Sequence, residues 1–324
     1  MAGRQGRILV IRGGAIGDFI LTLPVFAALR RAFPSAHITV LGYPWIAGLA
    51  LAGRLVDEVQ ALEGRDYALF FSPKVGADLP AEPAAFFAGF DLIVSYLFDP
   101  DRTFETNVHR VSQAQFFAGS HRPGTGLGRH ATEVFLEPLQ ALAIFDADPV
   151  PRLRLPRSSA GVKLRGNGQH PPAGTGWLGA HPGSGSERKN WPEERWARLL
   201  AELSRHTPES LLLVGGEAEQ DRLSRLAPHW PADRLRIARN EPLVQLATRL
   251  AGCTAFLGHD SGITHLAAAL GVPVLAMWGE TDPAIWSPRG SGARLLRPEH
   301  GLGTLSEERV LAGLLDLLAA GKDA

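Results

Sequence analysis

Residues 7–33 read RILVIRGGAIGDFILTLPVFAALRRAF, and this stretch decides the fold class. The apolar run at 7–12 predicts a buried strand, and a glycine-rich turn follows it. The remaining residues, 17–33, predict an amphipathic helix. A strand, a glycine turn and a helix in this order are typical of the opening of an α/β unit that binds a nucleotide.

The turn does not carry the glycine pattern of a dinucleotide-binding domain. That pattern needs G-x-G-x-x-G and an acidic residue about 20 positions later, at the end of the second strand. Here Arg12 stands at the first glycine position, and residues 39–45, TVLGYPW, contain no carboxylate. An NAD-dependent oxidoreductase is therefore disfavoured. Asp18, on the turn, either caps the helix or takes part in chemistry.

The composition indicates an ordinary globular protein. The chain has 324 residues, 45% of them hydrophobic and 20% charged, which is enough for two domains with separate cores. A formal net charge of +0 gives no electrostatic case for nucleic acid as a partner. The single cysteine, Cys253, and the absence of a signal-peptide pattern predict a cytoplasmic protein.

Apolar strand runs alternate with helical patterns along both halves of the chain, which predicts an α/β fold of two Rossmann-like domains with parallel sheets. We expect an N-terminal domain at 1–155, a linker rich in Pro, Gly and Arg at 156–175, and a C-terminal domain at 176–324. The predicted strands are 7–12, 37–41, 55–59, 91–97, 177–183, 210–216, 255–258 and 273–279. The predicted helices are 17–33, 130–145, 192–205, 217–227, 243–253, 261–271 and 305–320.

Three strand-to-helix turns of the second domain lie at the edge where open α/β sheets bind ligands. The first, HPGSGSERKNWPEERW, offers glycine backbone N–H groups and Lys189 to a phosphate, although it could also be a surface loop. The second, LLLVGGEAEQ, contains Glu217, which either accepts hydrogen bonds from a ribose or merely stabilises the first turn of a helix.

The third turn, in GHDSGITHLAAALGVP, is the strongest nucleotide signal. Asp260 and Ser261 are predicted to cap a helix whose N-terminus carries partial positive charge and unpaired N–H groups, as a diphosphate requires. Asp260 could also be a simple helix cap. His265, four residues after Ser261, is either a ligand of the donor or a buried helix histidine.

These residues give the chain a resemblance to the bacterial heptosyltransferases of glycosyltransferase family 9. The likeness covers most of the chain and is tightest at GAIGDFILTLP, ERKNWPEERW, LLLVGGEAE and GHDSGITHLAAALGVP followed by WGETDP, in matching order and spacing. The family implies the GT-B fold, in which two Rossmann-like domains face each other across a cleft. It also implies metal-independent, inverting transfer of a sugar, most often heptose from ADP-heptose, onto a lipopolysaccharide-core acceptor.

The resemblance also implies roles for individual residues. Asp18 is expected to be the catalytic base, with Lys189 near the donor phosphates or sugar. Donor binding is expected from a further set: Ser184, Glu217, Asp260, Ser261, Gly262 and His265. No metal or other cofactor is expected besides the nucleotide-sugar donor. The C-terminal helix at 305–320 is expected to pack back on the first domain.

Several features of the acceptor side stay open at this stage. Gly14 and Gly17 are expected to clear space for a ligand at the Asp18 turn. Lys74 and Arg110, together with Arg102 and Arg122, either form a cationic surface for a phosphorylated glycolipid or oligosaccharide acceptor or are solvated surface charges. Peripheral contact with the inner face of the bacterial inner membrane is also left open.

The sequence leaves three alternative functions open. His259, Trp278 and Glu280 depart from residues that are common in the family, so another donor is one alternative. A protein or a different glycan as acceptor is a second. A non-catalytic GT-B protein that binds a nucleotide is a third.

Overall fold

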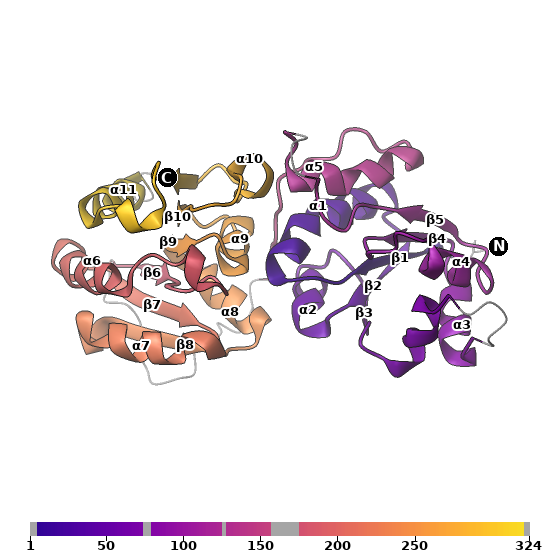
Figure 1. Ribbon diagram of the computed structural model, residues 1–324, viewed down its shortest axis with the longest axis horizontal. Coiled ribbons are helices and arrows are strands. Elements are labelled where there is room, and N and C mark those ends of the chain that lie inside the picture. The colour runs from indigo at the N-terminus through magenta and orange to yellow at the C-terminus, as the bar shows by residue number, and fades with distance from the viewer. Residues whose placement is uncertain (1–4, 74–78, 125–127, 157–174, 321–324) are drawn as a thin grey trace. The chain divides into compact units, whose positions relative to one another are not determined.

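The computed structural model describes residues 5–73, 79–124, 128–156 and 175–320. The chain divides into two compact units, Met1–Pro149 and Val150–Ala324 (Figure 1). Residues 150–156 belong to the second unit, where the Leu153 N–H donates to the Ala269 carbonyl. Most of the predicted linker, 157–174, lies outside the described residues.

The first unit contains, among its described residues, a five-stranded parallel sheet of order β3-β2-β1-β4-β5. The strands are β1 (Arg7–Arg12), β2 (His37–Gly42), β3 (Glu58–Ala61), β4 (Leu92–Ser95) and β5 (Gln115–Ala118). The order reverses between β1 and β4, which places the switch point of this sheet directly beside the glycine turn.

Helices cover both faces of the first sheet. They are α1 (Ile16–Ala32), α2 (Pro44–Ala52), α3 (Ala81–Ala88), α4 (Thr103–His109) and α5 (Ala131–Leu136), with 3-10 turns η1 (Arg65–Phe71) and η2 (Glu137–Leu142). Leu9 and Ile11 of β1 point into a core with Phe87 and Phe104, from α3 and α4. Ile8 and Val10 point to the other face by strand alternation, and there α1 packs beside α2 and α5.

The second unit contains, within 175–320, a six-stranded parallel sheet of order β11-β10-β9-β6-β7-β8. The strands are β6 (Trp177–Ala180), β7 (Ser210–Gly215), β8 (Leu235–Arg239), β9 (Cys253–His259), β10 (Val274–Met277) and β11 (Ala293–Leu296). Here the chain switches sides between β6 and β9. Both sheets therefore confirm the prediction of two Rossmann-like α/β units.

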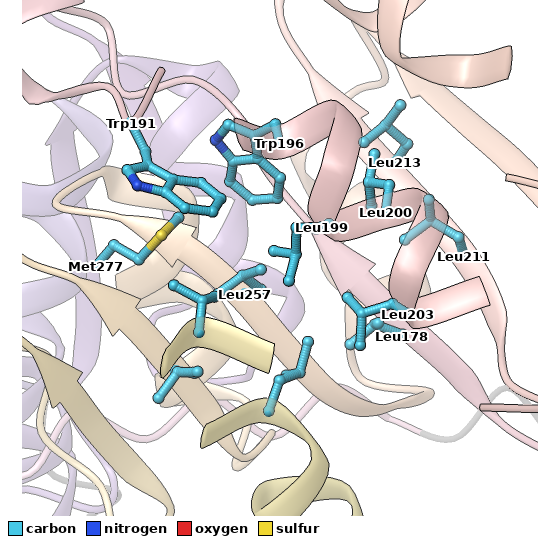
Figure 2. Close-up of a cluster of buried hydrophobic side chains, with 14 of the residues drawn as sticks. Leu178, Trp191, Trp196, Leu199, Leu200, Leu203, Leu211, Leu213, Leu257 and Met277 are labelled. Carbon is cyan, nitrogen blue, oxygen red and sulfur yellow. The ribbon is translucent and has the colours of Figure 1, made fainter. Parts of the chain in front are cut away.

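The core of the second unit lies on the face of its sheet that is covered by α6 (Glu193–His206), α7 (Gln220–Leu226) and α11 (Glu307–Ala320). Figure 2 shows Trp191 and Trp196 in one cluster of buried side chains with Met277 and Leu257, which come from β10 and β9. The buried side chains of α11 belong to this core, and the helix packs against α6, β9 and β10. The remaining elements are α8 (Leu243–Leu250), α9 (Gly262–Ala269), α10 (Pro283–Trp286) and the 3-10 turns η3 (Glu187–Lys189), η4 (Glu217–Glu219), η5 (Ala227–His229), η6 (Ala232–Arg234) and η7 (Leu302–Thr304).

Some predicted elements differ from the structure. The strand predicted at 55–59 begins only at Glu58, because the Asp57 carboxylate before it accepts the Ile38 N–H and pairs with Arg30. The helix predicted at 130–145 is α5 followed by the 3-10 turn η2. Cys253, expected at the end of a helix, is the first residue of β9.

Candidate functional site

Asp18 lies in the first turn of α1, at the carboxyl edge of the first sheet. The N-cap of this helix is Ala15, so the hypothesis that Asp18 is the N-cap residue is wrong. One carboxylate oxygen of Asp18, Oδ2, accepts the Ala15 N–H at 3.1 Å. The side chain of Asp18 remains 32% exposed, so a ligand can still reach the carboxylate.

The glycine turn brings the backbone close to this carboxylate. Gly14 has φ +97°, a left-handed conformation that disfavours other residues, and a Cβ there would lie 2.9 Å from Asp18 Oδ2. Gly17 is the second residue of α1. Glycine at position 14 is thus required by the geometry of the Asp18 turn.

Arg12, which in the sequence only interrupts a glycine pattern, orients this turn through hydrogen bonds. Its guanidinium is buried against the Phe135 ring, 4.5 Å from the centroid. Nη2 donates to the Asp18 carbonyl at 3.2 Å and lies 3.9 Å from Asp18 Oδ1, while Nη1 donates to the His121 carbonyl at 3.0 Å. An arginine at the end of a buried strand was the signal that could have indicated this role.

Two of the basic residues expected on the acceptor side, Arg102 and Arg110, are engaged within the first unit. Arg102 pairs with Glu105 at 2.6 Å, and Arg110 Nη1 donates to Asn107 Oδ1 at 3.1 Å. Arg110 is also exposed, at the end of α4. Lys74 lies outside the described residues.

In the second unit, the switch point between β6 and β9 is bordered by the loops that follow these strands. Lys189, from the loop after β6, donates to Asp260 Oδ2, after β9, at 2.6 Å. The same carboxylate oxygen accepts the Thr281 hydroxyl at 2.7 Å. Asp260 is therefore not the helix cap that the sequence suggested, and it joins three loops of the sheet edge.

Ser261 alone caps α9. Its hydroxyl oxygen accepts the Thr264 N–H at 3.3 Å, and it also lies 3.3 Å from His181 Nδ1. Gly262 is the first residue of the helix, where backbone N–H groups have no partner inside the helix. The positive end of the α9 dipole is thus adjacent to the Lys189–Asp260 pair.

His259 holds two of these loops together from the interior. Its Nε2 accepts the Trp191 N–H at 2.9 Å, and its Nδ1 lies 3.3 Å from the Gly183 carbonyl, so that Nδ1 carries the proton. Burial lowers the pKa of His259 to about 3 and that of His181 to about 4. Both imidazoles are therefore neutral supports of the loops.

The other predicted donor residues differ in exposure. His265 is 5% exposed, and its ring meets Trp278 edge-on at 6.4 Å. The Ser184 hydroxyl lies 2.8 Å from the Ser186 carbonyl and 2.7 Å from Asn190 Oδ1, contacts that shape its own loop.

Glu219, which the sequence interpretation passed over in favour of Glu217, is the buried acid of the turn after β7. Glu217 is exposed, whereas Glu219 Oε2 accepts the Gly216 N–H at 2.9 Å. A Cβ at Gly183 would lie 2.4 Å from Glu219 Oε1, so this carboxylate lies against the loop that contains Lys189. The glycine at position 183, which has no side chain, was the sequence feature that could have indicated this contact.

Two negative findings apply to the described ranges alone. No group of three or more His, Cys, Asp or Glu side chains is placed there to hold a metal ion. None of the helices there has the length and apolar character needed to cross a membrane.

The chain is similar in sequence to known glycosyltransferases. The family model described as glycosyltransferase family 9 (heptosyltransferase) matches residues 139–308. A putative glycosyltransferase of Haemophilus influenzae is 25% identical over 316 residues, which cover 87% of this chain and 86% of the relative. Lipopolysaccharide heptosyltransferase 1 of Escherichia coli is 32% identical over 130 residues, which cover 40% of either chain.

The fold agrees with these matches. The structure of E. coli ADP-heptose lipopolysaccharide heptosyltransferase II superposes with a TM-score of 0.77 and 19% identity, covering 98% of this chain and all of the other. A likeness at this identity shows the fold, and it supports the α/β GT-B fold of two Rossmann-like domains. The chain therefore belongs to glycosyltransferase family 9 and is a glycosyltransferase.

Proposed function

We propose that the chain transfers heptose from ADP-heptose to a lipopolysaccharide-core-type acceptor, by an inverting displacement that needs no metal. The relatives named above as heptosyltransferases support this choice of donor and acceptor. The observation that carries the proposal is the Lys189–Asp260 pair beside the N-terminus of α9, at the switch point of the second sheet.

This arrangement suits a sugar diphosphate. The N–H groups at the start of α9, from Gly262 onward, and the Lys189 ammonium supply positive charge for the diphosphate and for the charge that grows on it as the bond breaks. Asp260, already an acceptor of two hydrogen bonds, accepts from hydroxyls of the sugar. Glu217, which is exposed in the turn after β7, accepts from the ribose hydroxyls, whereas Glu219 is buried and already accepts the Gly216 N–H.

Asp18 acts as general base in this proposal. The acceptor oxygen attacks the anomeric carbon and forms a new C–O bond, while the bond from that carbon to the phosphate oxygen breaks and ADP leaves with the electron pair. The hydroxyl proton passes to the Asp18 carboxylate. Attack from the face opposite the leaving group inverts the anomeric configuration. The geometry is that of an inverting glycosidase, with a hydroxyl of the acceptor sugar in place of water.

The acceptor is a glycolipid or oligosaccharide of the lipopolysaccharide core, reached in the cytoplasm through peripheral contact with the inner membrane. A different glycan or a protein is the competing acceptor. No observation on the described residues favours either competitor.

The donor is tested by isothermal titration calorimetry with ADP, UDP, GDP and NAD, followed by ADP-heptose and other ADP-sugars. We expect ADP to bind more tightly than the other nucleotides and ADP-heptose to bind more tightly than ADP. Tighter binding of UDP, GDP or NAD would contradict the proposed donor. Release of ADP from ADP-heptose only when heptose-deficient lipopolysaccharide is present then tests the transfer itself.

A further inference from the structure

A pocket of about 640 Å³ opens at the carboxyl ends of β4 and β5 in the first unit. Because β4 lies next to β1, the pocket is at the same sheet edge as the Asp18 turn. Arg12 connects the two, since it donates to the carbonyl of His121 in the pocket wall and to the carbonyl of Asp18. The volume of the pocket is within the range of small-molecule binding pockets, about 300–1,000 Å³.

One wall of the pocket is aromatic. Phe98 is 67% exposed, and its ring meets the His121 ring at 4.7 Å and 61°. Such a ring in an open pocket offers a flat apolar surface to the C–H face of a sugar, while hydroxyls at the rim of the sugar remain available for hydrogen bonds.

The polar wall accepts hydrogen bonds better than it attracts anions. The pocket lining includes three carboxylates, Asp99, Glu105 and Glu137, against one guanidinium, Arg102, and Glu137 is paired with Arg129 from outside the lining. Arg102 is held by Glu105 through two contacts, Nε to Oε2 at 2.9 Å and Nη2 to Oε1 at 2.6 Å. With Glu105 and Glu137 each paired with an arginine, the remaining carboxylate of the lining is Asp99, which accepts the Phe104 and Glu105 N–H groups. A phosphate entering the pocket would meet the charge of Asp99 while the Arg102 guanidinium is already engaged, which is unfavourable.

We infer that this pocket binds an uncharged sugar ring of the acceptor, stacked on Phe98, and that it discriminates against a phosphorylated sugar. The inference rests on the proposed function, because it takes the ring to belong to the molecule that Asp18 deprotonates. It replaces the cationic acceptor surface that the sequence suggested around Arg102 with a selective site for hydroxyl groups.

The test is saturation-transfer NMR and titration of the whole chain with a panel of methyl hexopyranosides and methyl heptopyranosides and with their 6- or 7-phosphates. We expect at least one neutral glycoside to bind, with millimolar affinity, and its phosphate to bind at least tenfold more weakly. Phe98→Ala should weaken binding of that glycoside at least tenfold. Phe145→Ala, which alters a phenylalanine that is 74% exposed and absent from the pocket lining, should leave it unchanged.

A second variant tests the charge argument. Glu105→Gln removes the carboxylate that neutralises Arg102, so binding of the phosphorylated sugar should increase several-fold while that of the neutral glycoside changes little. The inference is overturned if no neutral glycoside binds, if the phosphates bind as well to the unaltered chain, or if Phe98→Ala has no effect. ADP titration of the same variants separates this outcome from failure of the proposed donor site, since ADP binding should persist in all of them.

Discussion

Lys189 and Asp260 neutralise each other at 2.6 Å, and any diphosphate that binds beside them must share the lysine with the carboxylate. The two side chains are 35% and 12% exposed, so solvent screens the pair only partly. Because of this competition, substituting the lysine and substituting the carboxylate should change ADP affinity in different directions. If the pair did not contact the diphosphate, neither substitution should change ADP affinity.

Lys189→Ala should weaken ADP binding by about tenfold or more, because it removes a cation and leaves the Asp260 carboxylate facing the phosphates. Asp260→Asn should have the opposite effect on ADP, strengthening or preserving its affinity, yet lower the rate of transfer from ADP-heptose. Arg188→Ala, at an exposed neighbouring cation, serves as the control. Calorimetry measures each affinity, and equal ADP affinity in the unaltered chain and Lys189→Ala would exclude the phosphate contact.

The buried histidines make the second unit sensitive to acid. In the unfolded chain a histidine has a pKa near 6.5, whereas burial lowers the pKa of His259 to about 3 and of His181 to about 4. Stability from these neutral groups is therefore complete above pH 6.5 and is lost as pH falls toward the folded pKa values. Between pH 6.5 and 5, each histidine should reduce the free energy of unfolding by about 2 kcal/mol.

Urea unfolding at several pH values checks this expectation through tryptophan fluorescence, since six of the seven tryptophans, all except Trp45, lie in the second unit. His259→Gln should be less stable at pH 7, because the Trp191 N–H loses its acceptor, but should show a smaller loss between pH 6.5 and 5. An identical pH slope in this variant would contradict the assignment of a neutral, buried imidazole.

The turn between β1 and α1 offers a matched pair of glycines. Gly14→Ala would place a Cβ 2.9 Å from Asp18 Oδ2 at φ +97°, whereas a Cβ at Gly13 would make an ordinary 3.7 Å contact with Leu62. We expect Gly14→Ala to cost about 1–2 kcal/mol of stability from the left-handed backbone alone and to lower kcat by displacing the carboxylate. Gly13→Ala should leave stability nearly unchanged.

Thermal unfolding and steady-state kinetics measure both variants. If Gly14→Ala retained full stability and full kcat, the close approach of this glycine to Asp18 would have no functional meaning. A loss of kcat larger than any change in KM is the expected pattern, because the displaced group acts on the reaction and not on binding.

Long, strongly patterned elements are the ones that sequence predicts well. The helix predicted at 192–205 is Glu193–His206, since its buried Trp196, Leu199, Leu200 and Leu203 follow the helical period. The elements that were missed are short or lie at sheet edges. β8 and β11 contain exposed arginines and have only one paired neighbour each, so they carry no continuous apolar run.

The residues of the candidate site also differ in how well the sequence predicts them. Lys189, Asp260 and Ser261 could be predicted because their residue types stand on strand-to-helix turns, and the structure brings them together after β6 and β9. Arg12 and Glu219 were missed, because their roles depend on contacts with residues far along the chain, His121 and Gly183. Pairings at such separations are set by the tertiary fold and leave only a weak signal in the local sequence.

The proposed function requires different tasks of the two Rossmann-like units. In this proposal the second supplies positive charge from the start of α9 and Lys189, and the first supplies the Asp18 carboxylate, beside which Arg12 and the glycine turn lie. Asp18 is partly exposed and makes its helix contact through one oxygen only. Removing its charge should therefore disturb chemistry far more than folding.

The most direct measurement is the rate of ADP release from ADP-heptose, with heptose-deficient lipopolysaccharide as acceptor, for the unaltered chain and Asp18→Asn. Loss of a general base predicts a decrease of about 10²- to 10⁴-fold in the variant, with ADP affinity and melting temperature nearly unchanged. Equal rates of ADP release in the two proteins would contradict the assignment of Asp18 as the base.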